Sequence, residues 1–147
     1  MNESSQRKPI AGHGVCFGCG DENPAGLGMR YFIGVDDVVT GSYTPAAIHQ
    51  GPPGLSHGGV LFTLLDEGMG KAVWLAGHRC LTSQAEIRYL RPARLQEELT
   101  IRAWVERCDK RGTVHAKAEL LRPDGKPVAV TTGRFRPAPE QLETSGS

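Results

Sequence analysis

The stretch HGGVLFTLLDEGMGKAVWLA, residues 57–76, is the strongest helix candidate in this chain of 147 residues. Its apolar residues recur at steps of three and four, which predicts a helix over 60–76 with one face packed on a sheet. The opposite face is also mostly apolar, so we expect a second layer of contact there. The residues expected to face the sheet are Leu61, Leu64, Leu65, Gly68, Ala72 and Leu75.

Runs typical of strands lie on both sides of this helix. Those after it are joined in part by DKRG and PDGK, which are short enough for hairpins. The order predicts an α+β fold in which one long central helix is wrapped by an antiparallel sheet of five to six strands. The expected strands are 27–35, 38–44, 81–90, 99–108, 113–122 and 127–136.

The composition narrows the class of protein. Seventeen basic and sixteen acidic residues nearly cancel, so no nucleic-acid or membrane partner is expected from charge. The N-terminal residues contain no apolar run typical of a signal peptide, and the cysteine pattern suits a reducing compartment. We expect a cytoplasmic protein with one domain over 13–136, between flexible tails at 1–12 and 137–147.

Two adjacent acids, Asp66 and Glu67, interrupt the apolar helix. Glu67 has Lys71 four residues later, the favoured order for a helical ion pair. Asp66 has no cation at helical spacing, so burial should raise its pKa toward the working range of a general base. Asp66 is therefore the acid that calls for a functional role.

The helix is preceded by HQGPPGLSHGG, residues 49–59, a segment rich in glycine and proline. If the helix starts near Gly58, the amides of Gly58, Gly59 and Val60 point outward at the positive end of its dipole. Such donors suit a carbonyl oxygen that gains negative charge during acyl transfer. The alternatives are that Gly58-Gly59 is only a tight turn and that His57 is only a helix cap.

The distance along the helix leads to a further expectation. Asp66 follows His57 by nine residues, half a turn out of phase and about 13 Å along the axis. One helix cannot bring both ends of this segment to the same atom. If both serve one reaction, they come from two copies of the chain, which predicts a homodimer with two shared sites.

These residues resemble a known family. HGGVLFTLLDEGMG is similar to the signature of the PaaI-like hotdog-fold acyl-CoA thioesterases, and CFGCGDENPAGLGMRYF and TSQAEIRYLRPARLQEEL are similar to one branch of that superfamily. The resemblance covers roughly residues 16–136. It implies a hotdog fold that dimerises through the strand after the helix, over 81–91, as a dimer or a dimer of dimers. It also implies an acyl-CoA substrate and no cofactor.

The resemblance also implies roles for individual residues. Asp66 would be the general base or the nucleophile, and the Gly59 amide, with Gly58, would polarise the thioester carbonyl. His57 would orient the thioester or assist the leaving thiolate, and Thr82 would position water. Some relatives have Asn where this chain has Gly51, so the neighbouring Gln50 is a candidate for that side-chain amide. Further candidates for substrate contact are Val60, Phe62, Met69, Arg91 and Arg94.

Several of these binding residues have an ordinary structural explanation. Arg91 and Arg94 would meet the phosphates of coenzyme A, but basic residues on a strand are often simply solvated. Phe62 and Met69 border Asp66, which favours an apolar or aromatic acyl group, although core packing explains them equally well.

Cys16 and Cys19 form a Cys-x-x-Cys pair with His13 three residues earlier. Structural zinc takes four ligands, and the sequence offers no second pair, with Asp21 a weak fourth candidate. We therefore expect packed thiols rather than a zinc site or a redox pair, and assign no metal.

Two other functions stay open. A hotdog enoyl-thioester hydratase or dehydratase would pair a loop histidine, here His49, with the helix acid. An acyl-CoA-binding protein without turnover would typically lack that acid, and Asp66 is present.

Overall fold

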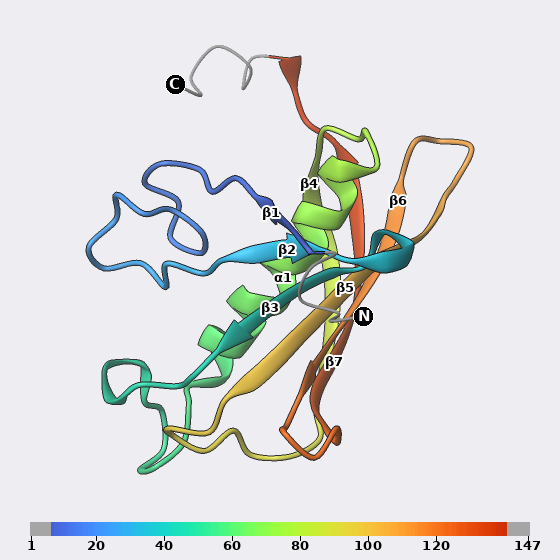
Figure 1. Ribbon diagram of the computed structural model, residues 1–147. Coiled ribbons are helices and arrows are strands. Elements are labelled where there is room, and N and C mark those ends of the chain that lie inside the picture. The colour runs from blue at the N-terminus through green and yellow to red at the C-terminus, as the bar shows by residue number, and fades with distance from the viewer. Residues whose placement is uncertain (1–6, 141–147) are drawn as a thin grey trace.

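The computed structural model describes residues 7–140, in which one helix lies against one face of an antiparallel sheet (Figure 1). This layout is the hotdog fold expected from the sequence. The main elements are β1 Lys8–Ile10, β2 Tyr31–Ile33, β3 Val39–Tyr43, α1 Gly58–Leu75, β4 Cys80–Tyr89, β5 Leu99–Cys108, β6 Val114–Leu121 and β7 Pro127–Pro137. Of two short 3-10 helices, Val35–Asp37 lies between β2 and β3, and Ala47–His49 lies between β3 and α1.

The sheet has seven strands in the order β1-β2-β3-β5-β6-β7-β4, against the five to six expected. The additional strand is β1, which lies in the segment expected to be a flexible tail. It pairs with β2. The strand expected over 27–35 is shorter because its first part binds another loop. The amides of Leu27 and Met29 donate to the carbonyls of Phe17 and Gly18, at 2.7 and 2.9 Å. Residues 1–6 and 141–147 of the expected tails lie outside the described residues.

Helix α1 packs its predicted apolar face against the sheet, and it contacts every strand from β3 to β7. Leu61, Leu64 and Leu65 are 0–3% exposed, whereas Leu75 at the end of the helix is 48% exposed and does not join the core. Gly68 allows the close approach, since a Cβ there would lie 3.3 Å from both Ala103 and Ile101. Within residues 7–140 no helix is long and apolar enough to cross a membrane.

Among the described strands, β4 forms one edge of the sheet and pairs only with β7. Most of its ten residues are exposed, whereas β6, in the middle of the sheet, alternates strictly between buried and half-buried positions. A long edge strand exposes unpaired backbone donors and acceptors, which proteins usually cover. The strand predicted to form the dimer interface is therefore available for pairing.

Candidate active site

Asp66 lies on α1 where the helix passes β4. The hydroxyl of Thr82, on β4, donates a hydrogen bond of 2.7 Å to Asp66 Oδ1. Burial raises the pKa of Asp66, the Thr82 hydrogen bond opposes this, and the neighbouring charge of Glu67 adds to it. The expected base is thus a half-buried carboxyl, and within residues 7–140 no cation shifts its pKa, while Thr82 donates a hydrogen bond to it.

A cavity of about 220 Å³ opens beside this carboxyl. Asp66 and Thr82 form a polar part of its wall, while Trp74, Leu81 and Phe135 supply apolar surface. Gly70 also lines it, and a Cβ at Gly70 would meet nothing within 4 Å. The missing side chain of Gly70 therefore keeps the space next to Asp66 open.

The helix begins at Gly58, as expected, with His57 as its N-cap. The Gly59 amide donates to His57 Nδ1 at 2.9 Å, and the Val60 amide donates to the His57 carbonyl at 3.1 Å. Two of the three amides expected to be free are therefore occupied within the chain. Among the described residues, the Gly58 amide has no hydrogen-bond partner. Because Nδ1 accepts, the neutral imidazole of His57 carries its proton on Nε2.

Tyr89, at the end of β4, is a site residue that the sequence reading did not assign. Its hydroxyl donates to the Gly58 carbonyl at 2.8 Å, which ties the start of α1 to the edge strand. Gly58, Tyr89 and Arg91 line a second hollow of about 370 Å³. The Tyr-x-x-Pro spacing over 89–92 was the available signal, but it did not indicate which atom Tyr89 would bind.

The segment 49–57 is a closed loop held by its own backbone. Gly51 donates to the Leu55 carbonyl and His57 to the His49 carbonyl, each at 2.9 Å. A Cβ at Gly51 would lie 2.9 Å from the Cα of His57, so the Asn found there in some relatives would displace the loop. Gln50 Oε1 accepts from the Gly54 amide at 2.8 Å, which leaves the Gln50 amide nitrogen as a donor.

The two hollows have no lining residue in common. Gly58 and Asp66 are eight residues apart on one straight helix, about 12 Å along its axis. One chain therefore does not bring the helix N-terminus and the helix acid to the same place.

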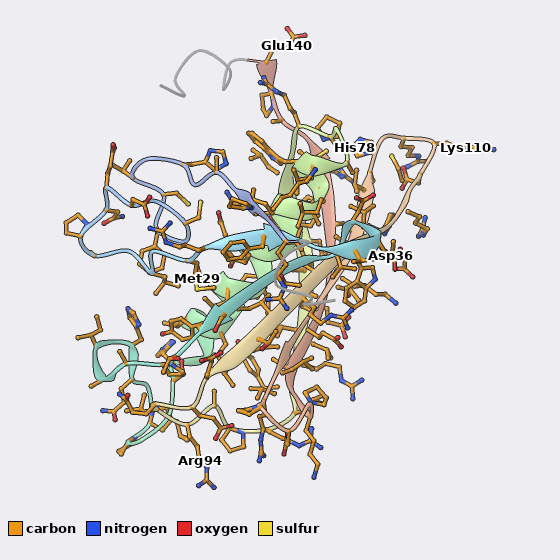
Figure 2. The ribbon with its side chains drawn as sticks, in the orientation of Figure 1. Met29, Asp36, His78, Arg94, Lys110 and Glu140 are labelled. Atoms are coloured by element: carbon orange, nitrogen blue, oxygen red, sulfur yellow. The ribbon has the colours of Figure 1, made fainter. Side chains whose placement is uncertain are left out.

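The other predicted binding residues have varied surroundings. Met69 is completely buried beneath β7, where a Cβ at Gly133 would lie 3.0 Å from its Cε, so it serves the core. Val60 and Phe62 are half-buried. Arg91 donates to the Pro127 carbonyl at 2.7 Å, whereas Arg94 points away from the fold (Figure 2).

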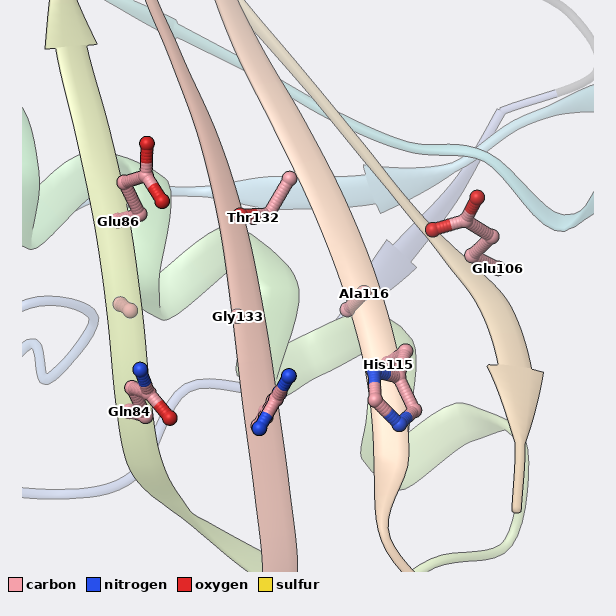
Figure 3. Close-up of a pocket in the computed structure, with 9 residues that line it drawn as sticks. Gln84, Glu86, Glu106, His115, Ala116, Thr132 and Gly133 are labelled. Atoms are coloured by element: carbon pink, nitrogen blue, oxygen red, sulfur yellow. The ribbon is translucent and has the colours of Figure 1, made fainter.

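Another hollow lies on the sheet face away from the helix (Figure 3). Side chains from four strands line it, among them Gln84, Glu86, Glu106 and His115. It includes neither Asp66 nor the helix N-terminus, and we assign it no part in the chemistry.

Comparison with known proteins identifies the family of this chain. Residues 53–129, more than half of the chain, match the family model of the thioesterase superfamily. Human acyl-coenzyme A thioesterase THEM5 is 38% identical over 67 residues, which are 44% of this chain and 27% of that protein. The chain therefore corresponds to only part of that relative.

Solved structures give the same result. A crystal structure of a thioesterase superfamily protein has a TM-score of 0.74 at 32% identity, with 78% of this chain and 56% of that chain covered. The E. coli PaaI protein of the phenylacetic acid degradation operon has a TM-score of 0.63 at 27% identity, covering 67% and 75%. A hypothetical thioesterase of Streptococcus pneumoniae with coenzyme A has 0.63 at 26%, covering 67% and 76%.

The chain belongs to the thioesterase superfamily. Within it, the structural neighbours include PaaI proteins, which confirms the PaaI-like hotdog branch that the sequence resembles.

Proposed function

We propose that this protein hydrolyses an acyl-CoA thioester to a free acid and coenzyme A. The observation that carries the proposal is the half-buried Asp66, whose pKa is raised and which Thr82 holds at the wall of a cavity. Family membership supports thioester chemistry, and the names of THEM5 and of the CoA-bound pneumococcal protein support coenzyme A as the thiol.

In the proposed reaction, Asp66 accepts a proton from water as the water oxygen attacks the carbonyl carbon. Alternatively, the carboxylate attacks directly and water hydrolyses the resulting anhydride. In either case a C–O bond forms, the C–S bond breaks, and the thiolate leaves and is protonated. Thr82, which donates to Asp66 Oδ1 at 2.7 Å, keeps the carboxyl oriented for this step.

The developing negative charge on the carbonyl oxygen requires fixed donors, which we assign to the Gly58-Gly59 helix N-terminus. The Gly58 amide, which has no partner among the described residues, is free to donate to the carbonyl oxygen. The Gly59 amide can donate only after its hydrogen bond to His57 Nδ1 is broken. His57 Nε2 then serves as a donor toward the thioester or the leaving sulfur.

We propose that each site is shared between two subunits that pair along β4. Antiparallel pairing of two β4 strands centred on Glu86 puts Thr82 opposite the partner's Tyr89, because the β-bulge between Thr82 and Gln84 adds one residue to the strand. Thr82 holds Asp66, and Tyr89 holds Gly58. The same pairing would therefore bring the carboxyl of one subunit to the helix N-terminus of the other and cover the open edge.

The remaining assignments concern the substrate. The cavity walls formed by Trp74, Leu81 and Phe135 favour an apolar or aromatic acyl group. Gln50, Val60 and Phe62 remain proposed acyl or thioester contacts. Arg91 and Arg94 remain proposed contacts to the nucleotide phosphates, with Arg91 better placed because it lines the hollow at the helix N-terminus. Further pairing of dimers and a cytoplasmic location stay predictions.

The direct test is thiol release from a panel of short, medium, long and aryl acyl-CoAs. We expect turnover that is fastest with apolar or aromatic acyl groups. No release from any acyl-CoA would overturn the proposal. Water addition to an enoyl-CoA through His49 would then support the hydratase, and binding without turnover would support an acyl-CoA-binding protein.

Mixing of two inactive variants tests whether the site is shared. Asp66→Asn removes the base, and Gly58→Pro removes the free amide at the first helical position, where proline is well tolerated. His57 has φ −64° and ψ 136°, which suits a residue before proline. A Gly58→Ala control keeps the amide but places the same Cβ about 3.3 Å from the Tyr89 hydroxyl.

We expect Gly58→Pro to lower kcat by roughly 10²–10³ and Gly58→Ala to have much less effect. Refolding the two inactive variants together at equal amounts should restore about a quarter of the wild-type rate, because half of the dimers are mixed and each has one intact site. Absence of recovery, with mixed dimers demonstrated, would show that each site lies within one chain.

A further inference from the structure

A group of metal-binding atoms lies where the N-terminal segment meets Glu67 of α1, and the proposed hydrolysis does not use it. The sulfurs of Cys16 and Cys19 and a carboxylate oxygen of Glu67 lie within 4.8 Å of one another. Cys19 is 2% exposed, and Cys16 and Glu67 are half-buried. The Cys-x-x-Cys pair was expected to be packed thiols because the sequence showed no further ligand. The fold supplies one, from α1.

The backbone around the two cysteines is built as a tight turn that faces the helix. The Cys16 amide donates to the His13 carbonyl at 2.7 Å, and the Gly20 amide donates to the Cys16 carbonyl at 2.9 Å. A Cβ at Gly18 would lie 3.0 Å from the carboxyl carbon of Glu67, so the turn rests directly on that side chain. Both thiols are thereby held toward the carboxylate by main-chain bonds.

The spacing of the atoms fits ligands of one metal ion. Cys16 Sγ lies 3.7 Å from Glu67 Oε1. Two such ligands on a tetrahedral zinc, at about 2.3 Å for sulfur and about 2.0 Å for oxygen, are about 3.5 Å apart. The Cys16–Glu67 pair therefore already has nearly the spacing of two ligands on one ion, and the Cys19 sulfur lies within 4.8 Å of both atoms.

The charges also balance with a divalent cation. Lys71 is 5% exposed, and its ammonium lies 3.9 Å from Glu67 Oε1 and donates to the Ala11 carbonyl at 2.9 Å. Two thiolates and one carboxylate carry three negative charges, which Lys71 and one divalent ion neutralise. A buried cluster with zero net charge avoids the high cost of an uncompensated buried charge.

We propose that Cys16, Cys19 and Glu67 form a zinc site that fastens the N-terminal segment to α1. Thiolate ligands with a carboxylate favour zinc over magnesium or calcium, which prefer oxygen. Cys16 and Glu67 also line the cavity next to Asp66, so the fourth position is open to water from that side. The proposal is independent of the proposed hydrolysis and stands whether or not the protein turns over an acyl-CoA.

Metal titration of the full chain tests this site. After treatment with a chelator and a thiol reductant, Co²⁺ should produce a thiolate-to-cobalt charge-transfer band that saturates at one ion per chain and that Zn²⁺ abolishes. Zinc should raise the Tm of the wild type, because only the folded chain presents the three ligands together.

The variants locate the ligands. Cys16→Ser should lose the charge-transfer band and the zinc-dependent rise in Tm, and Glu67→Gln should weaken zinc binding at least tenfold. Cys108→Ser is the matched control, since Cys108 is an exposed thiol on β5, and it should behave as wild type. Cys16 is chosen over the fully buried Cys19 so that folding is less affected.

Three results would overturn the proposal. One is the absence of a cobalt band and of bound zinc in the reduced wild type, which would leave packed thiols. Another is a band that survives in Cys16→Ser. The third is a protein isolated with a Cys16–Cys19 disulfide that forms equally well in the presence of zinc, which would favour a redox pair.

Discussion

Asp66 and Glu67 are neighbours on α1, yet their carboxyl groups have different partners. On the β4 side, Asp66 accepts a hydrogen bond from a hydroxyl, and burial raises its pKa. On the side of the N-terminal segment, Glu67 lies 3.9 Å from the ammonium of Lys71 and 3.7 Å from Cys16 Sγ. Successive helix residues point about 100° apart, so adjacent acids meet different elements. The comparison shows that the surroundings give two adjacent carboxyls different properties: the pKa of Asp66 is raised, and Glu67 lies beside an ammonium.

The largest effect should come from exchanging each acid for its amide. Asp66→Asn keeps the shape of the side chain but cannot take a proton, and we expect thiol release to fall by roughly 10²–10⁴. Glu67→Gln, assayed in metal-free buffer, should stay within about threefold of wild type, because the proposed reaction does not use Glu67.

Size-exclusion chromatography and thermal melting of both variants supply the control. Glu67→Gln leaves the buried ammonium of Lys71 without its carboxylate partner. The free energy of unfolding of this variant should therefore be lower than that of the wild type by about 1–3 kcal/mol. Equal losses of activity in two variants that are both folded would mean that the two acids do not differ in function.

An intermediate effect is expected from Thr82→Val, which removes the hydroxyl on the β4 side. The hydrogen bond from Thr82 lowers the pKa of Asp66 against the larger effect of burial, so its loss should raise that pKa further. Since the base works when ionised, kcat/KM declines as pH falls through this pKa. The acidic limb of the pH profile should therefore move to higher pH in Thr82→Val.

Thr82→Ser retains the hydroxyl and should leave the acidic limb where it is in the wild type. A limb that does not move in Thr82→Val would indicate that Asp66 is not the group that titrates in the profile. A fall in rate at all pH values that accompanies the shift would add a role of Thr82 in placing water.

The smallest effect should come from alanine substitution of the two glycines that follow the acids, Gly68 and Gly70, which should change the stability of the fold in opposite directions. A Cβ at Gly70 meets nothing within 4 Å, so Gly70→Ala should stabilise the fold by up to about 1 kcal/mol through helix propensity. A Cβ at Gly68 would lie 3.3 Å from Ala103 and Ile101, so Gly68→Ala should destabilise the fold by about 1 kcal/mol.

Denaturant unfolding of both alanine variants measures these differences. Stabilisation by both substitutions would contradict the tight packing at Gly68, and destabilisation by both would contradict the open space at Gly70. Either result would weaken the contrast between the two faces of the helix.

Much of the site could be predicted because it depends on short spacing within α1. The lack of a cation at helical spacing from Asp66, the Glu67–Lys71 pair and the helix start at Gly58 all follow from distances of a few residues. The sequence left open whether His57 caps the helix, because capping of the Gly59 amide depends on which rotamer His57 adopts. The Tyr89 contact to Gly58 was missed because it joins residues 31 positions apart, for which a single sequence has no periodic signal.

The sequence by itself determined the helix, the hairpin order of β5 to β7, the family, and the position of Asp66 on an apolar helix without a cation at helical spacing. These depend on hydrophobic periodicity, turn residues and local spacing, which involve residues close together in the sequence and can therefore be recognised from the sequence. Only the tertiary structure decided that β1 joins the sheet and that Lys71 is buried. It alone placed the Cys16 and Cys19 thiols against Glu67, 51 residues beyond Cys16. Such contacts depend on how loops close between distant segments, and they appear only when the chain is folded.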